Sequence, residues 1–294
     1  MAEQKVGWIG TGVMGRSMCM HLLQAGYTCA VHNRTKSKAQ DVLDAGATWC
    51  DTPGEVAAQS DVVFSIVGFP SDVEETMFGA EGVLATAKPG TVVVDMTTSK
   101  PVLARQIAEK AAEQSVQALD APVSGGDLGA RKGSLAIMVG GEKSVYEQVL
   151  PLFEIMGENI AYMGPAGAGQ DTKMSNQILI AGTMIGVVES LLYAYRTGLD
   201  LDRVIDVIGT GAASSWSINN LGRRIVQSDF APGFYIKHFI KDMGIALEEA
   251  QRMNLSLPGL ALVNQFYIAA QAQGLENLGT QGLYRVLARL NAQE

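Results

Sequence analysis

The stretch Val6-Gly7-Trp8-Ile9-Gly10-Thr11-Gly12-Val13-Met14-Gly15 joins a short apolar segment to the pattern Gly-x-Gly-x-x-Gly. Helical spacing of Met18, Leu22 and Leu23 predicts a helix directly after the glycines. A strand that passes through three glycines into a helix is typical of a dinucleotide-binding turn. The alternative, a glycine turn without a ligand, is disfavoured because a second apolar segment, residues 29–32, follows as the motif requires.

Each glycine of this turn has a distinct physical purpose. The first permits the tight strand-to-helix turn, the second lets a pyrophosphate approach bare backbone, and the third lets the helix pack close to the strand. The helix then presents unpaired N–H groups and the positive end of its dipole to the phosphates. The predicted cofactor-binding residues of the turn are Gly10, Thr11, Gly12, Val13, Met14 and Gly15.

The end of the second predicted strand indicates which dinucleotide binds. An NAD-binding turn places an acidic residue about 20 residues past the glycines, but this chain reads His32-Asn33-Arg34-Thr35-Lys36-Ser37-Lys38 there. A carboxylate would repel a ribose 2′-phosphate, whereas the Arg34 guanidinium can hold it with paired hydrogen bonds. The sequence predicts NADPH as the preferred cofactor, NAD as the weaker one, and Asn33, Arg34 and Thr35 as ligands. The alternative is a solvated basic turn.

Length, charge and cysteine content narrow the class of protein. A chain of 294 residues exceeds the usual size of one domain, so two domains are expected. The net charge of −8 argues against nucleic acid or an anionic membrane as a partner. Cys19, Cys29 and Cys50 lack metal-ligand spacing, so we expect no metal site and reduced thiols in a cytoplasmic protein. Because a first strand is predicted to begin by residue 5, we expect no signal peptide.

Short apolar strands alternate with helical stretches in the first half of the chain. Such alternation predicts an α/β fold, a Rossmann-type doubly wound sheet that is mostly parallel and has helices on both faces. After the two strands already described, further strands are predicted at residues 61–67, 91–95, 116–119, 135–139 and 159–163.

Ligands of such sheets bind at the carboxyl ends of the strands, so the loops that follow the strands are candidate site segments. These loops are Gly68-Phe69-Pro70, Met96-Thr97-Thr98-Ser99 and Asp120-Ala121-Pro122-Val123-Ser124-Gly125-Gly126. The last of them combines a hydroxyl with successive bare N–H groups, which suits a carboxylate. Its alternative interpretation is an ordinary turn, because Ser-Gly is a common turn dipeptide.

The periodicity becomes helical past Gly164 and stays so to the end of the chain. We therefore predict a dinucleotide-binding domain over residues 1–164 and an all-helical substrate and oligomerisation domain over 165–294. The first helix of the second domain has an apolar stripe that is core or subunit interface, formed by Met174, Ile178, Ala181, Ile185, Val188 and Leu192. Its apolar run also suggests a membrane span, but Glu189 within the run favours a buried helix. Later helices are predicted at about 200–209, 214–227, 236–253 and 258–273.

Lys173, Asn176 and Gln177 stand at i, i+3 and i+4, so they share one face near the start of this long helix. That face is off the apolar stripe. A lysine next to a glycine-rich turn could reach the mouth of the nucleotide-binding domain and move a proton. Composition alone favours the alternative, a surface lysine.

The chain resembles the β-hydroxyacid dehydrogenase family along nearly its whole length. The resemblance rests on four separated motifs: Gly10-x-Gly12-x-x-Gly15, the segment from Asp120 to Gly126, Gly164-x-x-Gly167-x-Gly169-x-x-x-Lys173-x-x-Asn176, and Lys241-Asp242. It implies that Lys173 is the catalytic acid/base and that Ser124, Gly125, Gly126 and Asn176 hold the substrate carboxylate. It also implies that Phe69, Pro70 and Thr98 line the nicotinamide side and that Lys241 closes the cofactor site.

The family's amide often stands four residues after the lysine, where this chain has Gln177. Asn176 stands at three, so the division of roles between these two amides stays open. We assign Asn176 to the catalytic group and Gln177 to substrate binding.

The resemblance implies hydride transfer between NADP(H) and a small β-hydroxyacid or its semialdehyde or keto acid. The substrate class includes 3-hydroxyisobutyrate, tartronate semialdehyde, glyoxylate and succinic semialdehyde. Self-association as a dimer or tetramer through the helical domain is also expected. Three alternatives remain: an imine reductase, against which Lys173 counts; a non-catalytic nucleotide-binding protein, which would tolerate loss of these motifs; and an oxidative decarboxylase of a phosphorylated sugar acid, for which a longer chain is expected.

Overall fold

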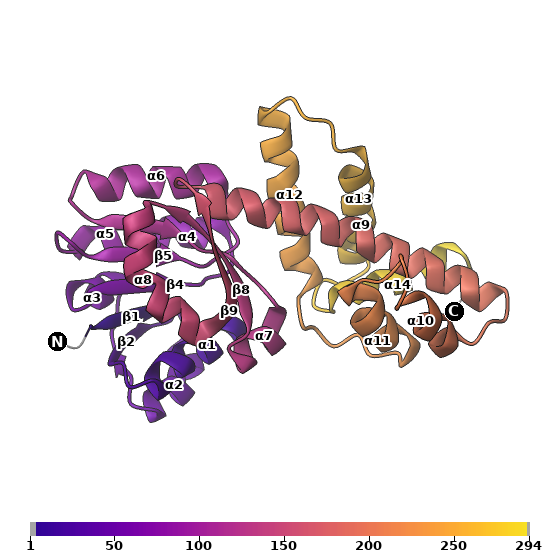
Figure 1. Cartoon of the computed structure of the whole chain (residues 1–294), viewed down its shortest axis with the longest axis horizontal. Helices are drawn as coiled ribbons and strands as arrows, with labels where there is room; N and C mark the ends of the chain where they lie inside the picture. Colours follow the sequence, from indigo (N-terminus) through magenta and orange to yellow (C-terminus); the bar gives the residue numbers. More distant parts are fainter. Residues whose placement is uncertain (1–3, 293–294) are drawn as a thin grey trace. The chain divides into compact units, whose positions relative to one another are not determined.

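The computed structural model describes residues 4–292 and forms two compact units, Met1–Lys173 (unit 1) and Met174–Glu294 (unit 2) (Figure 1). The division falls inside helix α9 (Ala168–Arg196), which begins in unit 1 and ends in unit 2. The boundary predicted from sequence, between residues 164 and 165, lies just before this helix. Each unit has its own hydrophobic core, as two separate periodicities would require.

Unit 1 is built on one sheet with the strand order β3-β2-β1-β4-β5-β6-β8-β7, and β9 pairs with β8. The strands are β1 (Val6–Ile9), β2 (Cys29–His32), β3 (Thr48–Trp49), β4 (Val62–Ser65), β5 (Val92–Asp95), β6 (Gln117–Asp120), β7 (Val123–Ser124), β8 (Leu135–Gly141) and β9 (Gly157–Gly164). The path from β3 to β6 is parallel, whereas β8 runs antiparallel to β6 and β7. The predicted doubly wound α/β sheet is confirmed. The two-residue strands β3 and β7 were not predicted because they are too short to show a period.

Helices cover both faces of this sheet (Figure 1). Phe64 packs in one core with residues of α1 and α8, and its neighbour Val63 packs in a second core with residues of α3, α4 and α6. Both faces are buried, which explains why β4 is apolar without alternation. The helices of unit 1 before α9 are α1 (Val13–Gln24), α2 (Gln40–Asp44), α3 (Pro53–Ala58), α4 (Pro70–Phe78), α5 (Val83–Thr86), α6 (Pro101–Ala112), α7 (Gly126–Lys132) and α8 (Lys143–Met156).

Unit 2 is helical throughout its regular structure. After α9 it contains α10 (Leu201–Ile208), a π-helical turn (Ser217–Gly222), α11 (Arg223–Val226), α12 (Ile236–Arg252), α13 (Pro258–Ala272) and α14 (Leu283–Leu290). The helix predicted over 214–227 is the π-helical turn continued by α11. Helix α14 was not predicted, although its buried residues Leu283, Val286 and Leu287 have helical spacing.

The predicted stripe of α9 lies in the core of unit 2. Met174, Ala181, Val188 and Leu192 are buried, and Ile178 and Ile185 are half-buried against the same core. By length and composition α9 is apolar enough to cross a membrane, but the core helix of a soluble protein passes the same test. The packing of the stripe favours a core helix, as expected from the sequence.

The turn between β1 and α1 depends on close backbone contact. Gly10 has a φ of +97°, in the left-handed region that favours glycine, and its carbonyl oxygen accepts a hydrogen bond of 2.9 Å from the Trp8 indole. A Cβ atom on Gly15 would overlap the Gly10 carbonyl oxygen and lie 2.7 Å from Cγ2 of Ile66. A Cβ atom on Gly12 would meet nothing within 4 Å. The third glycine is therefore needed for packing, whereas the space beside the second is open.

We predict that Gly15→Ala lowers the free energy of unfolding by about 2 kcal/mol, because the added methyl group overpacks the contact between α1 and the β1 turn. Gly12→Ala, the matched control in the same motif, should cost less than about 1 kcal/mol, the range of a helix N-cap change. Urea denaturation of both variants without ligand is the measurement. An equal loss in the two variants would contradict the packing role of Gly15.

Candidate functional site

The glycine turn is joined to the loop after β2 through one amide side chain. The Thr11 N–H donates a hydrogen bond of 3.0 Å to Oδ1 of Asn33, and Nδ2 of Asn33 donates one of 2.8 Å to the carbonyl oxygen of Thr35. Asn33 therefore holds the two loops at the carboxyl ends of β1 and β2 together. The structure gives this predicted cofactor residue a positioning contact on each side.

Unsatisfied polar groups mark the same turn. Thr11 is 3% exposed, and its Oγ1 has no hydrogen-bond partner among the described residues. A buried hydroxyl without a partner costs about 1–3 kcal/mol. Gly12 is the N-cap of α1 and offers no side-chain cap to the first N–H groups of the helix, and Val13 is exposed. A buried donor, open space at Gly12 and an uncapped helix end fit a dinucleotide pyrophosphate.

Arg34 lies at the surface beside a carboxylate. Its side chain is 89% exposed, and its Nη1 lies 3.4 Å from Oδ1 of Asp72. The other oxygen of Asp72 accepts a hydrogen bond of 3.0 Å from the Phe69 N–H, at the start of α4. Because exposed ion pairs contribute only about 0–1 kcal/mol, a phosphate can replace this partner of Arg34 at little cost.

The loops after β4 and β5 are also tied to one another. The buried Thr97 accepts at its Oγ1 a hydrogen bond of 2.9 Å from the Val67 N–H. Phe69 is exposed, Pro70 begins α4, and Thr98 is half-buried directly after Thr97. The three residues predicted on the nicotinamide side thus stand on loops that one threonine connects. Thr97 was not singled out from the sequence, although it adjoins Thr98.

Two acidic residues are buried at the ends of β5 and β6. Asp95 and Asp120 are register partners on these parallel strands. Oδ1 of Asp95 accepts hydrogen bonds from the Ser65 hydroxyl at 3.0 Å and from the Thr97 N–H at 3.1 Å. Burial, with a smaller contribution from the nearby Asp120 carboxylate, raises the pKa of Asp95 to about 6 against the hydrogen bonds that lower it. Asp95 was not predicted as a site residue, since an aspartate at a strand end has no sequence signature of its own.

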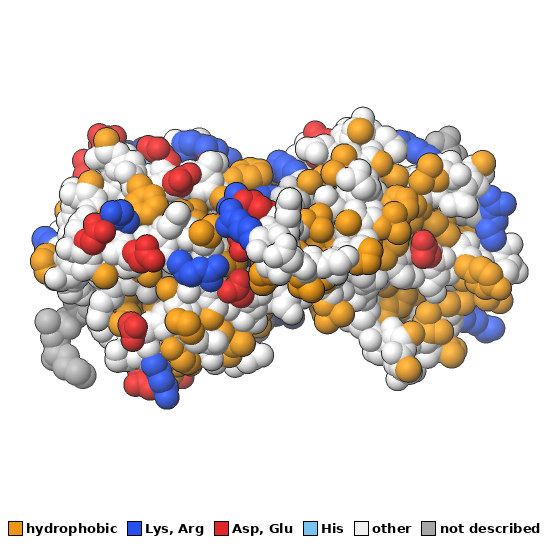
Figure 2. Space-filling model, turned by 90° about the horizontal axis from the view of Figure 1, so that it is seen from above, with side chains coloured by type: hydrophobic (Ala, Val, Ile, Leu, Met, Phe, Trp, Pro, Cys, Tyr) orange, Lys and Arg blue, Asp and Glu red, His pale blue; other side chains and the backbone are white. Residues whose placement is uncertain are grey.

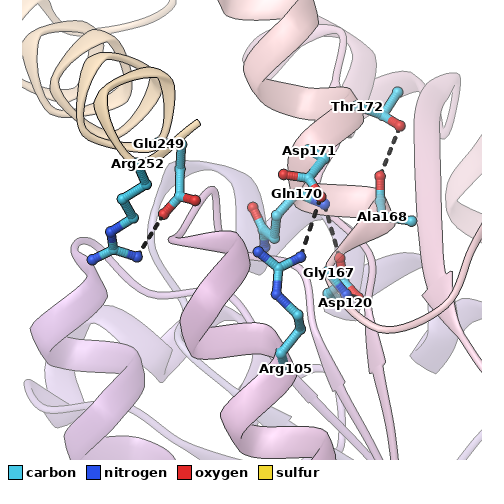
Figure 3. A network of polar contacts seen from close by, with 9 residues as sticks. All are labelled: Arg105, Asp120, Gly167, Ala168, Gln170, Asp171, Thr172, Glu249 and Arg252. Carbon is cyan, nitrogen blue, oxygen red and sulfur yellow. Dashed lines mark hydrogen bonds and ion pairs between the residues drawn. The ribbon is translucent and has the colours of Figure 1, made fainter. Parts of the chain in front are cut away.

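Asp120 caps the amino end of α9 (Figure 3). Its Oδ1 accepts the Gly167 N–H at 2.7 Å and its Oδ2 accepts the Gln170 N–H at 2.8 Å. Burial raises the pKa of Asp120, although these two N–H groups favour the charged form. On the outer side of the same turn, Arg105 of α6 pairs with Asp171 at 3.3 Å (Figure 3). The first turn of α9 is therefore attached to β6 and α6.

The Gln170 side chain adds a second attachment of this turn. It is 0% exposed, its Oε1 accepts the Ser99 N–H at 3.0 Å, and its Nε2 donates to the Thr97 carbonyl oxygen at 2.7 Å. The start of α9 is thereby bound to the loop after β5. Gln170 lies inside the glycine-rich motif, but nothing in the sequence indicated its partners, which are more than 70 residues away in the chain.

The predicted carboxylate turn has an unusual backbone. Ser124 ends β7 and is half-buried, and Gly125 and Gly126 follow with φ of +130° and +61°. Glycine is favoured at both positions because their φ values are positive, so the turn has no side chains there. Bare backbone N–H groups of this kind suit a small anion.

Lys173 is the last residue of unit 1, and it is 6% exposed. It follows Gln170 by three residues on α9, about one turn further along the helix. The surface-lysine alternative is therefore wrong for this position. Lys173 therefore lies inside the structure, one turn after the helix start that Asp120 and Gln170 hold.

Within unit 2, the amides after Lys173 form a chain of contacts. Nδ2 of Asn176 donates to Oε1 of Gln177 at 2.7 Å, and Nε2 of Gln177 donates to Oδ2 of Asp242 at 2.6 Å. The Lys241 ammonium lies 3.1 Å from Oδ1 of the same carboxylate. Gln177 is 2% exposed and joins α9 to α12, whereas Asn176 is only half-buried. This contact gives Gln177 a structural role and leaves Asn176 the more accessible of the two amides.

We predict that Asp95 makes stability depend on pH. The pKa of Asp95 is about 6 in the folded state and 3.8 in an unfolded chain. Its contribution to the free energy of unfolding is therefore full at low pH, where the carboxyl is protonated, and is lost as the pH rises through 6. Near pH 8, the free energy of unfolding of Asp95→Asn should therefore be up to about 3 kcal/mol higher than that of the parent chain. This difference should shrink below pH 4.

Urea denaturation at several pH values measures this difference. Asp41→Asn, at an exposed carboxylate paired with Arg16, is the control and should change the pH profile little. A gain for Asp95→Asn that is the same at every pH would count against the buried carboxylate.

The two halves of the chain match two family models. Residues 5–164 match the NAD binding domain of 6-phosphogluconate dehydrogenase. Residues 167–287 match the model described as NAD-binding of NADP-dependent 3-hydroxyisobutyrate dehydrogenase. The matched segments include the glycine turn, Ser124, Lys173 and Lys241.

Individual proteins agree with these models. A probable 3-hydroxyisobutyrate dehydrogenase-like 1, mitochondrial, of Arabidopsis thaliana is 54% identical over 99% of this chain and 87% of its own length. The 2-hydroxy-3-oxopropionate reductase of Escherichia coli is 38% identical over 96% of this chain and 97% of its own. The solved 3-hydroxyisobutyrate dehydrogenase of Mycobacterium tuberculosis with L-serine has a TM-score of 0.88 at 28% identity, covering 97% of this chain and 99% of that one. The chain belongs to the β-hydroxyacid dehydrogenase family and is an NAD(P)-dependent oxidoreductase that acts on CH–OH groups.

Proposed function

We propose that this dehydrogenase interconverts a small carboxylate-bearing aldehyde or keto acid and its β-hydroxyacid, with NADPH preferred over NADH. The observation that carries the proposal is Lys173, a buried lysine in the same unit as the glycine turn, one turn after the Asp120-capped start of α9. Substrates of the expected size are 3-hydroxyisobutyrate, tartronate semialdehyde, glyoxylate and succinic semialdehyde. Bound NADPH supplies a hydride for the carbonyl carbon.

The protein's own residues bind the substrate and move the proton. Lys173 donates a proton to the substrate oxygen during reduction and accepts it during oxidation. The N–H groups of Gly125 and Gly126, with the Ser124 hydroxyl, bind the substrate carboxylate. We assign the remaining amide contact to Asn176, because Gln177 is committed to Asp242.

The cofactor preference rests on the loop after β2. This loop carries Arg34, Lys36 and Lys38 and has no acidic residue before Asp41. Lys36 lies over the Trp49 ring at 5.0 Å, so Arg34, at 89% exposure, is the cation of the loop best able to meet a 2′-phosphate. The match of residues 167–287 to a model described as NADP-dependent supports the same preference. Lys241, paired with the buried Asp242, is proposed to complete the cofactor site.

A buried lysine favours catalysis over the non-catalytic and imine-reductase alternatives. Lys173 is buried one turn after the helix start that Asp120 caps, and a purely nucleotide-binding protein would need no lysine at that place. The four separated motifs also match a dehydrogenase that handles a carboxylate.

Self-association is proposed through unit 2, and the cytoplasm remains the expected location. Unit 2 exposes large apolar side chains that a monomer would leave in water, and the face in Figure 2 shows many hydrophobic side chains over it. These residues include Leu179, Tyr193, Val207, Trp216, Met253 and Leu262.

We expect Lys173→Met to lower kcat about 10³-fold, because general acid–base catalysis contributes on the order of 10²–10⁴ and methionine keeps the volume of the chain. The dissociation constant of NADPH should stay within about threefold, since the turn that binds it is intact. Steady-state kinetics with the four candidate substrates and a fluorescence titration of NADPH are the measurements.

Lys110→Met, at an exposed lysine paired with Glu113, is the control and should behave as the parent enzyme. Parental turnover by Lys173→Met would rule out the proton role. No turnover of any of the four substrates by the parent enzyme would instead refute the proposed substrate class.

Arg34→Ala should lower kcat/KM for NADPH about 10–100-fold, because charge-assisted hydrogen bonds contribute about 1.5–3 kcal/mol, and should leave kcat/KM for NADH nearly unchanged. Arg223→Ala, which removes an arginine paired with Asp206 in unit 2, is the matched control. Kinetics with both cofactors would contradict the assignment if the parent enzyme preferred NADH or if Arg34→Ala affected the two cofactors equally.

A further inference from the structure

We propose that Gln170 is a positioning residue that sets where Lys173 stands relative to the loop carrying Thr98. Gln170 has this role only if Lys173 moves the proton, as proposed above. Gln170 itself contacts neither of the reacting groups. It acts by holding α9, which carries Lys173, against the loop that carries Thr98. Thr98 is the residue predicted to lie beside the nicotinamide.

One side chain holds the backbone on both sides of Thr98. Oε1 of Gln170 accepts the N–H of Ser99 at 3.0 Å, and Nε2 donates to the carbonyl oxygen of Thr97 at 2.7 Å. The two partners are the residues immediately before and after Thr98. Gln170 is 0% exposed, so water does not compete for these bonds. The amide thus fixes the position of the Thr98 loop relative to the first turn of α9.

The backbone of the same residue is held from a different direction. The Gln170 N–H donates to Oδ2 of Asp120 at 2.8 Å, and the Gly167 N–H donates to Oδ1 of that carboxylate at 2.7 Å. The cap fixes the helix along its axis, and the side-chain amide fixes it sideways. Lys173 follows three residues later, about 4.5 Å along the axis and on nearly the same side. A shift of this turn would therefore move the lysine by a similar amount.

The chemistry of the contact requires glutamine. It needs one acceptor and one donor at the end of a two-methylene side chain, which is the side-chain amide of glutamine. Glutamate could accept from Ser99 but would turn an oxygen toward the Thr97 carbonyl, with the buried carboxylates of Asp95 and Asp120 close by. Methionine fills the same volume and makes neither bond. These two substitutions separate volume from hydrogen bonding.

The test compares Gln170→Met and Gln170→Glu with Asp171→Asn at the next residue, whose ion pair with Arg105 is exposed and contributes only about 0–1 kcal/mol. Gln170→Met should lower kcat about 10–100-fold, the cost of misplacing a reacting group by about 1 Å. The KM of the substrate and the dissociation constant of NADPH should stay within about threefold. Asp171→Asn should stay near parental values in all three quantities.

A second measurement needs neither substrate nor turnover. The protein without ligand is labelled with acetic anhydride. Peptide mass spectrometry measures the acetylation rate of Lys173, with the exposed Lys110 as the internal reference. Gln170→Met should change the labelling rate of Lys173 several-fold and leave that of Lys110 unchanged, and Asp171→Asn should change neither.

Parental kcat together with parental labelling in Gln170→Met would overturn the positioning role. Equal losses of kcat in Gln170→Met and Asp171→Asn would also overturn it, because they would indicate general weakening of the helix. If Gln170→Met does not fold, Gln170→Glu decides by the same criteria. If the parent enzyme turns over none of the four substrates, the proposed function fails, and the labelling comparison still tests the placement of Lys173.

Discussion

The structure of unit 1 depends on a buried carboxylate that meets a helix end. Asp120 stands where β6 ends, and both of its oxygens accept N–H groups from the first turn of α9. A negative charge at the positive end of a helix is favourable, and its effect is greater where water is absent. This contact joins the sheet that forms the cofactor turn to the helix that carries Lys173. The position of Lys173 relative to the glycine turn is therefore set by the interior of one unit.

Local polar groups are satisfied in most of this unit, and the exceptions are informative. Among the described residues, Thr11 and Ser99 have buried hydroxyls without a hydrogen-bond partner, and burial raises the pKa of Asp95 to about 6. Proteins tend to leave polar groups unsatisfied or charged groups buried at functional sites, and to compensate for the lost stability elsewhere. Here one place is the glycine turn, which contains Thr11, and the other is the loop after β5, which follows Asp95 and contains Ser99. Both lie at the carboxyl ends of the strands, where ligands of this architecture bind.

Contacts within unit 2 distinguish two amides, Asn176 and Gln177, that the sequence could place only on one face of a helix. Asn176 and Gln177 looked equivalent by spacing, since both lie on the Lys173 side of the helix. The structure separates them, because Gln177 is buried on Asp242 of α12 while Asn176 stays half-exposed. The difference comes from which neighbour each side chain meets, and α12 begins far beyond α9 in the chain.

The sequence alone determined the features that depend on neighbours along the chain. The glycine turn, the apolar strands of a sheet covered on both faces and the stripe of α9 follow from backbone sterics and from periods of two and 3.6 residues. Only the tertiary structure decided the burial of Lys173, the carboxylate of Asp95 and the partners of Gln170. The hydrogen bonds from Ser65 to Asp95 and between Gln170 and the Thr98 loop join residues 30 to more than 70 positions apart. A hydrogen bond of that span has no local pattern, because its geometry exists only after the sheet has brought the strand ends together.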